Sequence, residues 1–238
     1  PNRISFDKWV CRGLTFTIIM RLVSVVGSPP TGALLADIAV AGFFWLKTKS
    51  KLMSGLAIIL FAGLGLAFMP ESWHERMDTI QNYEEDESAM QRINSWAYSI
   101  NVASDRITGG GLSSWAPKTF AIYAPDPDTV FAAHSIYFSV LGDHGWPGLI
   151  LFLSILGLTW KNLSSVIKQT KGDPGSHQNF LARMLQVSLI AYMSGGAFLS
   201  LSYFDLFWHL FAISLLLNYQ LIKNNNKNDS IVPRNKFS

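Results

Sequence analysis

The residues best suited to chemistry lie in one long polar segment that ends at a histidine. The segment runs from about Pro70 to Ala133, and it leads into the sequence Ala132-Ala133-His134-Ser135-Ile136-Tyr137-Phe138. It holds arginines and most of the acidic residues of the chain, between apolar runs of membrane-spanning length. Charged side chains at membrane depth are costly and usually face a cavity or a partner. We therefore expect function at this membrane boundary, where chemistry on a lipid-linked substrate could take place.

The composition indicates an integral membrane protein. Hydrophobic residues make up 49% of the chain and charged residues 15%, whereas soluble domains carry about 25% charged residues. The single cysteine, Cys11, excludes an internal disulfide and a thiolate-rich metal site. The chain starts at Pro1 without a signal segment, close to an apolar run, so we expect it to be part of a longer protein.

Apolar runs of about 20 residues predict an all-α membrane protein, a polytopic helical bundle with about six spans. The first run is the weakest because Arg21 lies inside it. The expected spans are residues 12–28, 31–47, 52–69, 136–160, 180–202 and 205–222. The corresponding parts are N-terminal spans (1–69), a large loop (70–133), C-terminal spans (134–222) and a disordered tail (223–238).

The flanking charges predict the orientation of these spans. Basic residues cluster before the first span, in the second and fourth connections and in the tail, and the positive-inside rule makes that side cytoplasmic. The large loop, which carries acids such as Glu71 and Asp128, then faces outward. An aromatic cluster near the last turn fits either an interfacial belt or a lipid-chain contact; its members are Tyr203, Phe204, Phe207, Trp208 and His209.

Two patterns inside the loop predict local structure. Residues 88–100 read as an amphipathic helix with an apolar face of Ile93, Trp96, Ala97 and Ile100, placed on the membrane surface or against the bundle. Ser88 suits its N-cap, with a glutamine at the capping-box position. The glycines at 109–111 then favour a turn or a close backbone approach.

His134 is followed by a second pair of ionisable residues, Asp143 and His144. Nine residues separate His134 from Asp143, so helical geometry would place them about 13 Å apart, too far for an obvious catalytic dyad. From the residues alone, two readings of His134 carry equal weight: a functional group, or a structural one that acts as an interfacial anchor or a hydrogen-bonded surface group.

Three motifs in order resemble a known family. They are Glu84 to Trp96, the glycines at 109–111, and Ala133 to Gly145 followed by Gly148-Leu149. Together they resemble the bacterial O-antigen ligase and polymerase superfamily, and more narrowly the O-glycosylation ligases associated with exosortase systems. The similarity covers about Thr31 to Leu217.

The resemblance implies a multi-span enzyme of the bacterial inner membrane, with its large loop in the periplasm. Such an enzyme transfers a glycan from undecaprenyl pyrophosphate to an acceptor hydroxyl on a lipid, a glycan or a protein. Arg92 matches the family's loop arginine, and arginine suits a pyrophosphate leaving group. His134 matches the family's histidine, and histidine suits activation of a hydroxyl. The further substrate-binding candidates are Arg76, Arg106, Gly110, Gly111 and Tyr137.

One departure from the family pattern concerns a second cation. Family members commonly carry serine–arginine–glycine–alanine where this chain has Thr31 before Gly32 and Ala33. Either Arg21 or an upstream residue substitutes for that arginine, or the activity is impaired. Arg21 could equally snorkel or pair with Asp37.

Alternatives stay open for the function and for the arginine. The chain could be a polymerase that extends a lipid-linked glycan, or a non-catalytic transport subunit, although its spans carry few charges. Arg92 could be a solvated residue paired with Glu85 or Glu87. We expect no cofactor, no metal requirement and no nucleic-acid partner, since the acidic run at 84–87 lacks the spacing of a calcium loop. The expected partners are the lipid-linked glycan, the acceptor and membrane lipid.

Overall fold

The computed structural model describes residues 31–48, 50–67, 87–172 and 176–231. Within these ranges every regular element is a helix and there is no strand, which confirms the all-α class. The chain divides into two compact units near Met90. The expected first span, the candidate residues Arg21 and Arg76, and the acids at 84–86 lie outside the described residues.

The first unit contains two apolar helices in contact with each other. They are α2 (Thr31–Lys47) and α3 (Lys51–Ala67), which match the expected helices at 31–47 and 52–69. The Trp45 indole donates a hydrogen bond to the Lys51 carbonyl at 3.0 Å. This bond joins the end of one helix to the start of the next across a short connection, so the pair forms a helical hairpin.

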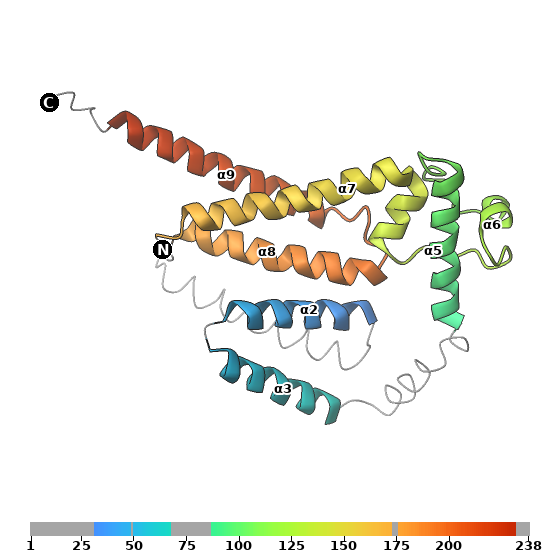
Figure 1. The fold of residues 1–238 in the computed structure, drawn as a ribbon, viewed down its shortest axis with the longest axis horizontal. Coiled ribbons are helices and arrows are strands. Elements are labelled where there is room, and N and C mark those ends of the chain that lie inside the picture. Colours follow the sequence, from blue (N-terminus) through green and yellow to red (C-terminus); the bar gives the residue numbers. More distant parts are fainter. Residues whose placement is uncertain (1–30, 49, 68–86, 173–175, 232–238) are drawn as a thin grey trace, which may run out of the picture. The chain divides into compact units, whose positions relative to one another are not determined.

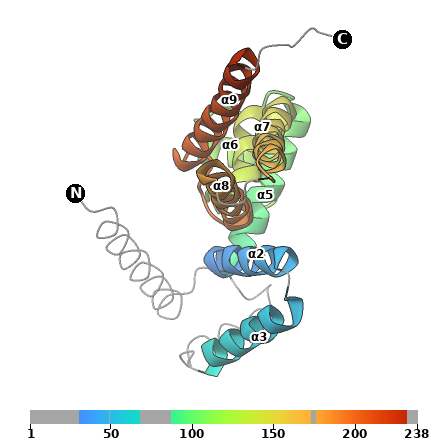
Figure 2. The same ribbon diagram turned by 90° about the vertical axis from the view of Figure 1, so that its left-hand side faces the viewer.

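The second unit is built on three helices that pack side by side, as Figures 1 and 2 show. They are α7 (Ile136–Gln169), α8 (His177–Gly195) and α9 (Leu206–Ile231), with the short 3-10 helix η1 (Gly196–Phe198) after α8. One core cluster joins α7, α8 and α9 around Ile136, Leu189 and Phe207, all fully buried. Phe207 was expected in an interfacial belt, but it stacks on Tyr192 inside this core.

A kink at Gly145 divides α7 into two helical segments. Gly145 has φ 65° and ψ −163°, values that essentially only glycine adopts. Pro147 then falls in the first turn of the second segment, where its missing N–H costs nothing. The expected uninterrupted span at 136–160 is therefore corrected: the long straight segment starts after Gly145 and extends to Gln169.

Two helices of the described chain are long and apolar enough to cross a membrane, namely Ile136–Gln169 and Leu206–Asn224. The remaining expected spans stay predictions. Helix α9 also continues to Ile231, so residues 223–231 of the expected disordered tail are helical.

Helix α5 (Glu87–Asp105) crosses the end of the bundle, and a short helix, α6 (Pro117–Tyr123), packs beside it (Figure 1). The helix itself confirms the prediction for residues 88–100, although it begins at Glu87, one residue before the expected cap. A small core of Tyr98, Val102 and Phe120 holds this part of the loop together.

Of the two placements predicted for Ile93 and Ile100 on α5, packing against the bundle is wrong, and contact with the membrane surface stays a prediction. Ile93 and Ile100 are 44% and 42% exposed, whereas the polar residues Asn94, Ser95 and Ser99 are buried. Buried polar groups require hydrogen-bond partners. Asn94 and Ser95 find them in the backbone of the loop that leads to His134, and Ser99 donates to the Ser95 carbonyl of α5 itself.

Candidate functional site

Successive side chains of α5 hold the extended segment that precedes His134. The Asn94 amide donates to the carbonyls of Asp126 and Thr129 at 2.9 and 3.1 Å and accepts from the Asp126 N–H at 2.8 Å. Ser95 Oγ donates to the Phe131 carbonyl at 2.9 Å. These bonds satisfy both the helix side chains and loop carbonyls that would otherwise lack partners. The segment is therefore fixed to α5 up to the residues next to His134.

Trp96 completes this attachment immediately beside His134. Its indole N–H donates to the Ala133 carbonyl at 2.7 Å, and its ring stacks on Phe138 with centroids 4.9 Å apart. Trp96 thus contacts the chain on both sides of His134, at the residue before it and in the first turn of α7.

The backbone of His134 is strained. Its φ of 47° makes it the one non-glycine residue with positive φ in the described chain. Such conformations cost about 1–3 kcal/mol and persist where the surroundings impose them, often at functional sites. Here the α5 hydrogen bonds and the start of α7 impose it, and Nδ1 of His134 lies 3.3 Å from Ser200 Oγ.

Two influences keep the His134 imidazole neutral. Partial burial lowers its pKa from the ordinary value, and the positive charge of Arg92 lowers the pKa further. Since the ordinary histidine pKa is about 6.5, the lowered value leaves the ring uncharged and able to accept a proton near neutral pH. The structure therefore brings the two residues predicted as the catalytic pair into electrostatic contact.

Arg92 lies one helical turn before Trp96 on the same side of α5. Its Nε is buried and makes no hydrogen bond among the described residues. Ser135 Oγ, directly after His134, is in the same condition. Buried donors without partners are rare in folded proteins, so both groups are suited to binding a ligand at this place.

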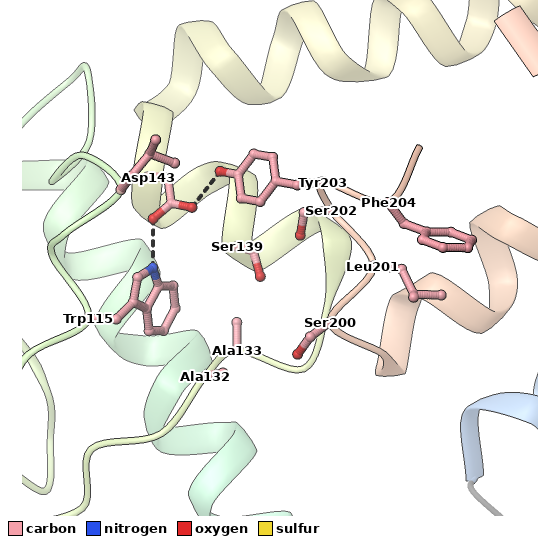
Figure 3. A pocket seen from close by; sticks show the side chains of 11 residues that line it. Trp115, Ala132, Ala133, Ser139, Asp143, Ser200, Leu201, Ser202, Tyr203 and Phe204 are labelled. Atoms are coloured by element: carbon pink, nitrogen blue, oxygen red, sulfur yellow. Dashed lines mark hydrogen bonds between the residues drawn. The ribbon is translucent and has the colours of Figure 1, made fainter. Parts of the chain in front are cut away.

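A pocket of about 570 Å³ adjoins His134 through Ser200 (Figure 3). Its wall comes from four parts of the chain: the connection before α6, the segment before His134, the first segment of α7, and the loop between η1 and α9. The lining residues are Leu112, Trp115, Ala132, Ala133, Ser139, Asp143, Ser200, Leu201, Ser202, Tyr203 and Phe204.

Asp143 is the charged group of this pocket and is only 4% exposed. The Trp115 indole donates to one carboxylate oxygen at 2.6 Å, and the Tyr203 hydroxyl donates to the other at 2.5 Å (Figure 3). Burial raises the pKa of Tyr203, and its hydrogen bond to Asp143 and the carboxylate charge raise it further. Tyr203 therefore stays protonated as a donor. Its hydroxyl also lies 3.2 Å from Nε2 of His144.

The loop that contains the glycines at 109–111, called the glycine loop, docks onto the kink of α7. This confirms the close backbone approach predicted for these glycines. The N–H groups of Gly110 and Gly111 donate to the carbonyls of Gly142 and Asp143 at 2.8 and 2.9 Å, and the Trp146 N–H donates to the Ile107 carbonyl at 3.1 Å. A Cβ at Gly109 would lie 2.5 Å from the Gly145 nitrogen. The amide groups of Gly110 and Gly111 are therefore engaged with α7.

The other predicted substrate-binding residues do not gather at His134. Arg106 follows the last turn of α5, about 20 Å along the helix from Arg92, and its guanidinium lies over the Tyr123 ring at 5.9 Å. Tyr137 donates its hydroxyl to the Met193 carbonyl at 2.9 Å and so joins α7 to α8. Arg76 lies outside the described residues.

Sequence reasoning missed the roles of Trp115, Tyr203, Ser200 and Ser135. Tyr203 was assigned to an aromatic belt, and 60 residues separate it from Asp143. The available signal was Asp143 itself, because a carboxylate inside an apolar helix needs donors, but nothing in the sequence says where they come from.

Within the described ranges, no three His, Cys, Asp or Glu side chains gather as metal ligands would. The acidic run at 84–86 falls outside these ranges, so independence from metal stays a prediction.

Comparison with known proteins gives one match. The family model described as O-antigen ligase matches residues 16–153, more than half of the chain and a range that includes Arg92, the glycine loop and His134. No curated protein and no solved structure matches the chain.

Proposed function

Because the chain belongs to the O-antigen ligase family, we propose that it is a membrane glycosyltransferase that moves a glycan from undecaprenyl pyrophosphate to an acceptor hydroxyl. In this proposal His134 accepts the proton of the acceptor and Arg92 binds the pyrophosphate. The reaction needs no metal.

The observation that carries the proposal is the pairing of a neutral, strained histidine with an arginine whose Nε is buried. His134 is held at positive φ beside Arg92, whose charge lowers the histidine pKa. Arg92 Nε and Ser135 Oγ are both buried, and neither has a hydrogen-bond partner in the part of the chain that the structure describes. A proton acceptor and unengaged donors in one place are what glycosyl transfer from a pyrophosphate requires.

The reaction balances with these groups. The acceptor oxygen attacks the anomeric carbon and forms the new glycosidic bond, while the bond from that carbon to the pyrophosphate oxygen breaks. The acceptor proton passes to the His134 imidazole. The pyrophosphate leaves on its lipid with the added negative charge, which the Arg92 guanidinium stabilises because arginine donates in a fixed planar fork.

We place the site at the periplasmic face of the bacterial inner membrane. The basic residues flanking the spans support this orientation through the positive-inside rule. Helix α5 crosses the end of the bundle with Ile93 and Ile100 exposed, which suits contact with a membrane surface near a polyprenyl chain.

This chain has Thr31 where the family pattern has an arginine, so the second positive charge of this scheme has no assigned residue. Without that arginine we expect transfer to be slow rather than differently directed, because Arg92 and His134 are both present.

The test is glycan transfer by the full-length protein in membrane vesicles. Undecaprenyl-pyrophosphate glycan is supplied with lipid, glycan and protein acceptors, and a folded, inserted His134→Ala protein is the inactive control. We expect a product with wild-type protein only. Absence of transfer to every acceptor class, from protein shown to be folded, would sink the proposal.

The same assay separates the ligase from the polymerase. A ligase gives one transferred chain for each acceptor, and a polymerase gives a ladder that grows by repeat units. Family membership supports both activities equally, so the pattern of products decides between them.

A further inference from the structure

The pocket beside His134 has a chemistry different from that of the Arg92 side. None of its lining residues is a lysine or an arginine, and its charged group is the carboxylate of Asp143. A pyrophosphate would meet electrostatic repulsion there and no cation. The pocket is therefore unsuited to the leaving group, although it adjoins the same histidine.

Its lining suits a neutral polyhydroxylated ring. Three serine hydroxyls and the Asp143 carboxylate offer hydrogen-bond acceptors, while Trp115, Tyr203 and Phe204 supply aromatic surface. Aromatic faces carry negative potential, which attracts the slightly positive C–H bonds of a sugar ring. Its volume of about 570 Å³ lies within the range of small-molecule sites.

Asp143 keeps accepting capacity after its internal bonds are counted. An ionised carboxylate has about four lone-pair positions, and Trp115 and Tyr203 each occupy one, on different oxygens. These two bonds also fix its orientation. A carboxylate held in this way can accept bonds from two adjacent sugar hydroxyls without losing conformational entropy on binding.

We propose that this pocket is the subsite for the sugar of the acceptor, with Asp143 as the residue that binds its hydroxyls. The inference rests on the proposed function and makes it more specific: the acceptor presents a neutral sugar ring rather than a peptide side chain. Ser200 both lines the pocket and lies 3.3 Å from His134, so a hydroxyl at that edge faces the base. The pyrophosphate occupies the Arg92 side.

The test measures binding rather than transfer. The full-length protein in detergent is titrated with methyl glycosides of hexoses and N-acetylhexosamines, and separately with inorganic pyrophosphate, by saturation-transfer NMR. The variants are Asp143→Asn, which removes the negative charge, and Ala132→Trp, which fills the pocket from an exposed position. Ile122→Trp adds the same indole to an exposed position of α6 that does not line the pocket, and is the matched control.

We expect at least one glycoside to bind saturably and to lose about tenfold in affinity in both pocket variants, as for a lost charged hydrogen bond. Ile122→Trp should bind like wild type, and the affinity for pyrophosphate should stay within about twofold throughout. The inference is overturned if no glycoside binds, if Ala132→Trp binds like its control, or if Ala132→Trp weakens pyrophosphate. Each of those results leaves the transfer test of the proposed function standing, since that test does not measure sugar binding.

Discussion

Replacing Gly145 by alanine should separate the glycine loop from the kink of α7. A Cβ on this residue would lie 1.9 Å from the Ile107 carbonyl oxygen and 2.5 Å from the Gly109 nitrogen. Both are backbone atoms, so no side-chain rotation relieves the overlap. The φ of 65° with ψ of −163° is also unavailable to alanine without strain.

The loop can stay docked or undock in Gly145→Ala, and the two responses cost similar amounts of free energy. If the loop stays docked, backbone strain of about 1–3 kcal/mol adds to an overlap of about 1–3 kcal/mol. If it undocks, the bonds from Gly110, Gly111 and Trp146 are lost, at about 0.5–1.5 kcal/mol each. Undocking therefore costs about 1.5–4.5 kcal/mol, and we expect a local loss of about 2 kcal/mol or more within that range, with the three-helix core intact.

Hydrogen exchange of the full-length protein measures this loss directly. Amides at 110, 111 and 146 should exchange about 30-fold faster in Gly145→Ala, the factor that corresponds to about 2 kcal/mol. Gly157→Ala is the matched control on the same helix, because a Cβ there meets nothing within 4 Å. Equal exchange in the two variants would refute the assignment of the kink as the docking site of the loop.

Three substitutions and one pH profile test the surroundings of His134 and of the pocket beside it. In Arg92→Gln the lowered pKa of His134 should rise toward about 6.5 without reaching it, since the positive charge is removed and burial remains. NMR titration of labelled His134 measures this pKa. An unchanged or lower pKa would contradict the effect of the Arg92 charge on His134. Because the folded-state pKa is depressed, the neutral ring is the form present at pH 7, and activity should fall as pH drops through the folded pKa, below about 6.5. Tyr203→Phe should lower the free energy of unfolding by about 1 kcal/mol, somewhat less than a buried hydrogen bond to a charged group contributes, because the ring is half exposed. The exposed Tyr219→Phe is the control, and equal melting of both variants would mean that the bond contributes nothing. Asn94→Ala removes three hydrogen bonds to the segment before His134. The attachment of this segment to α5 should lose about 2–4 kcal/mol of free energy, which is measured as faster proteolysis of residues 124–133. Unchanged cleavage would count against this attachment.

The length of an apolar run predicts a helix well where the neighbouring residues in the sequence determine both helix ends. The predicted helices at 31–47 and 52–69 agree with α2 and α3 to within two residues. Each is an apolar run between polar connections, so the positions of its two ends follow from the sequence. The kink in α7 was not predicted, because glycine and proline together are tolerated in membrane helices. What forces the break is the Ile107 carbonyl, from a segment nearly forty residues earlier.

The face of α5 shows a different limit. Periodicity predicts an apolar face that includes Ile93 and Ile100, but it does not predict that α5 buries Asn94 and Ser95, which it does because an irregular loop supplies carbonyls that need donors. A pattern based on hydrophobicity assumes that the partner is apolar. The loop partner of α5 is backbone, and no periodicity in the loop reveals it.

The candidate site also contains some residues that the sequence predicts and others that it does not. Arg92 and His134 could be found from motif order, and the structure brings them into electrostatic contact. The pair formed by Asp143 and Tyr203 could not, because it depends on how the loop after η1 returns to α7.

Steady-state transfer kinetics of the full-length protein test the central claim most directly, namely that Arg92 binds the pyrophosphate donor and His134 accepts the proton. We expect His134→Ala to lower kcat by about 10²–10⁴-fold with little change in the KM for the lipid-linked donor. Arg92→Ala should raise that KM and lower kcat, while Arg106→Ala, at the far end of α5, should behave like wild type. Wild-type kcat and KM in both His134→Ala and Arg92→Ala would contradict the account.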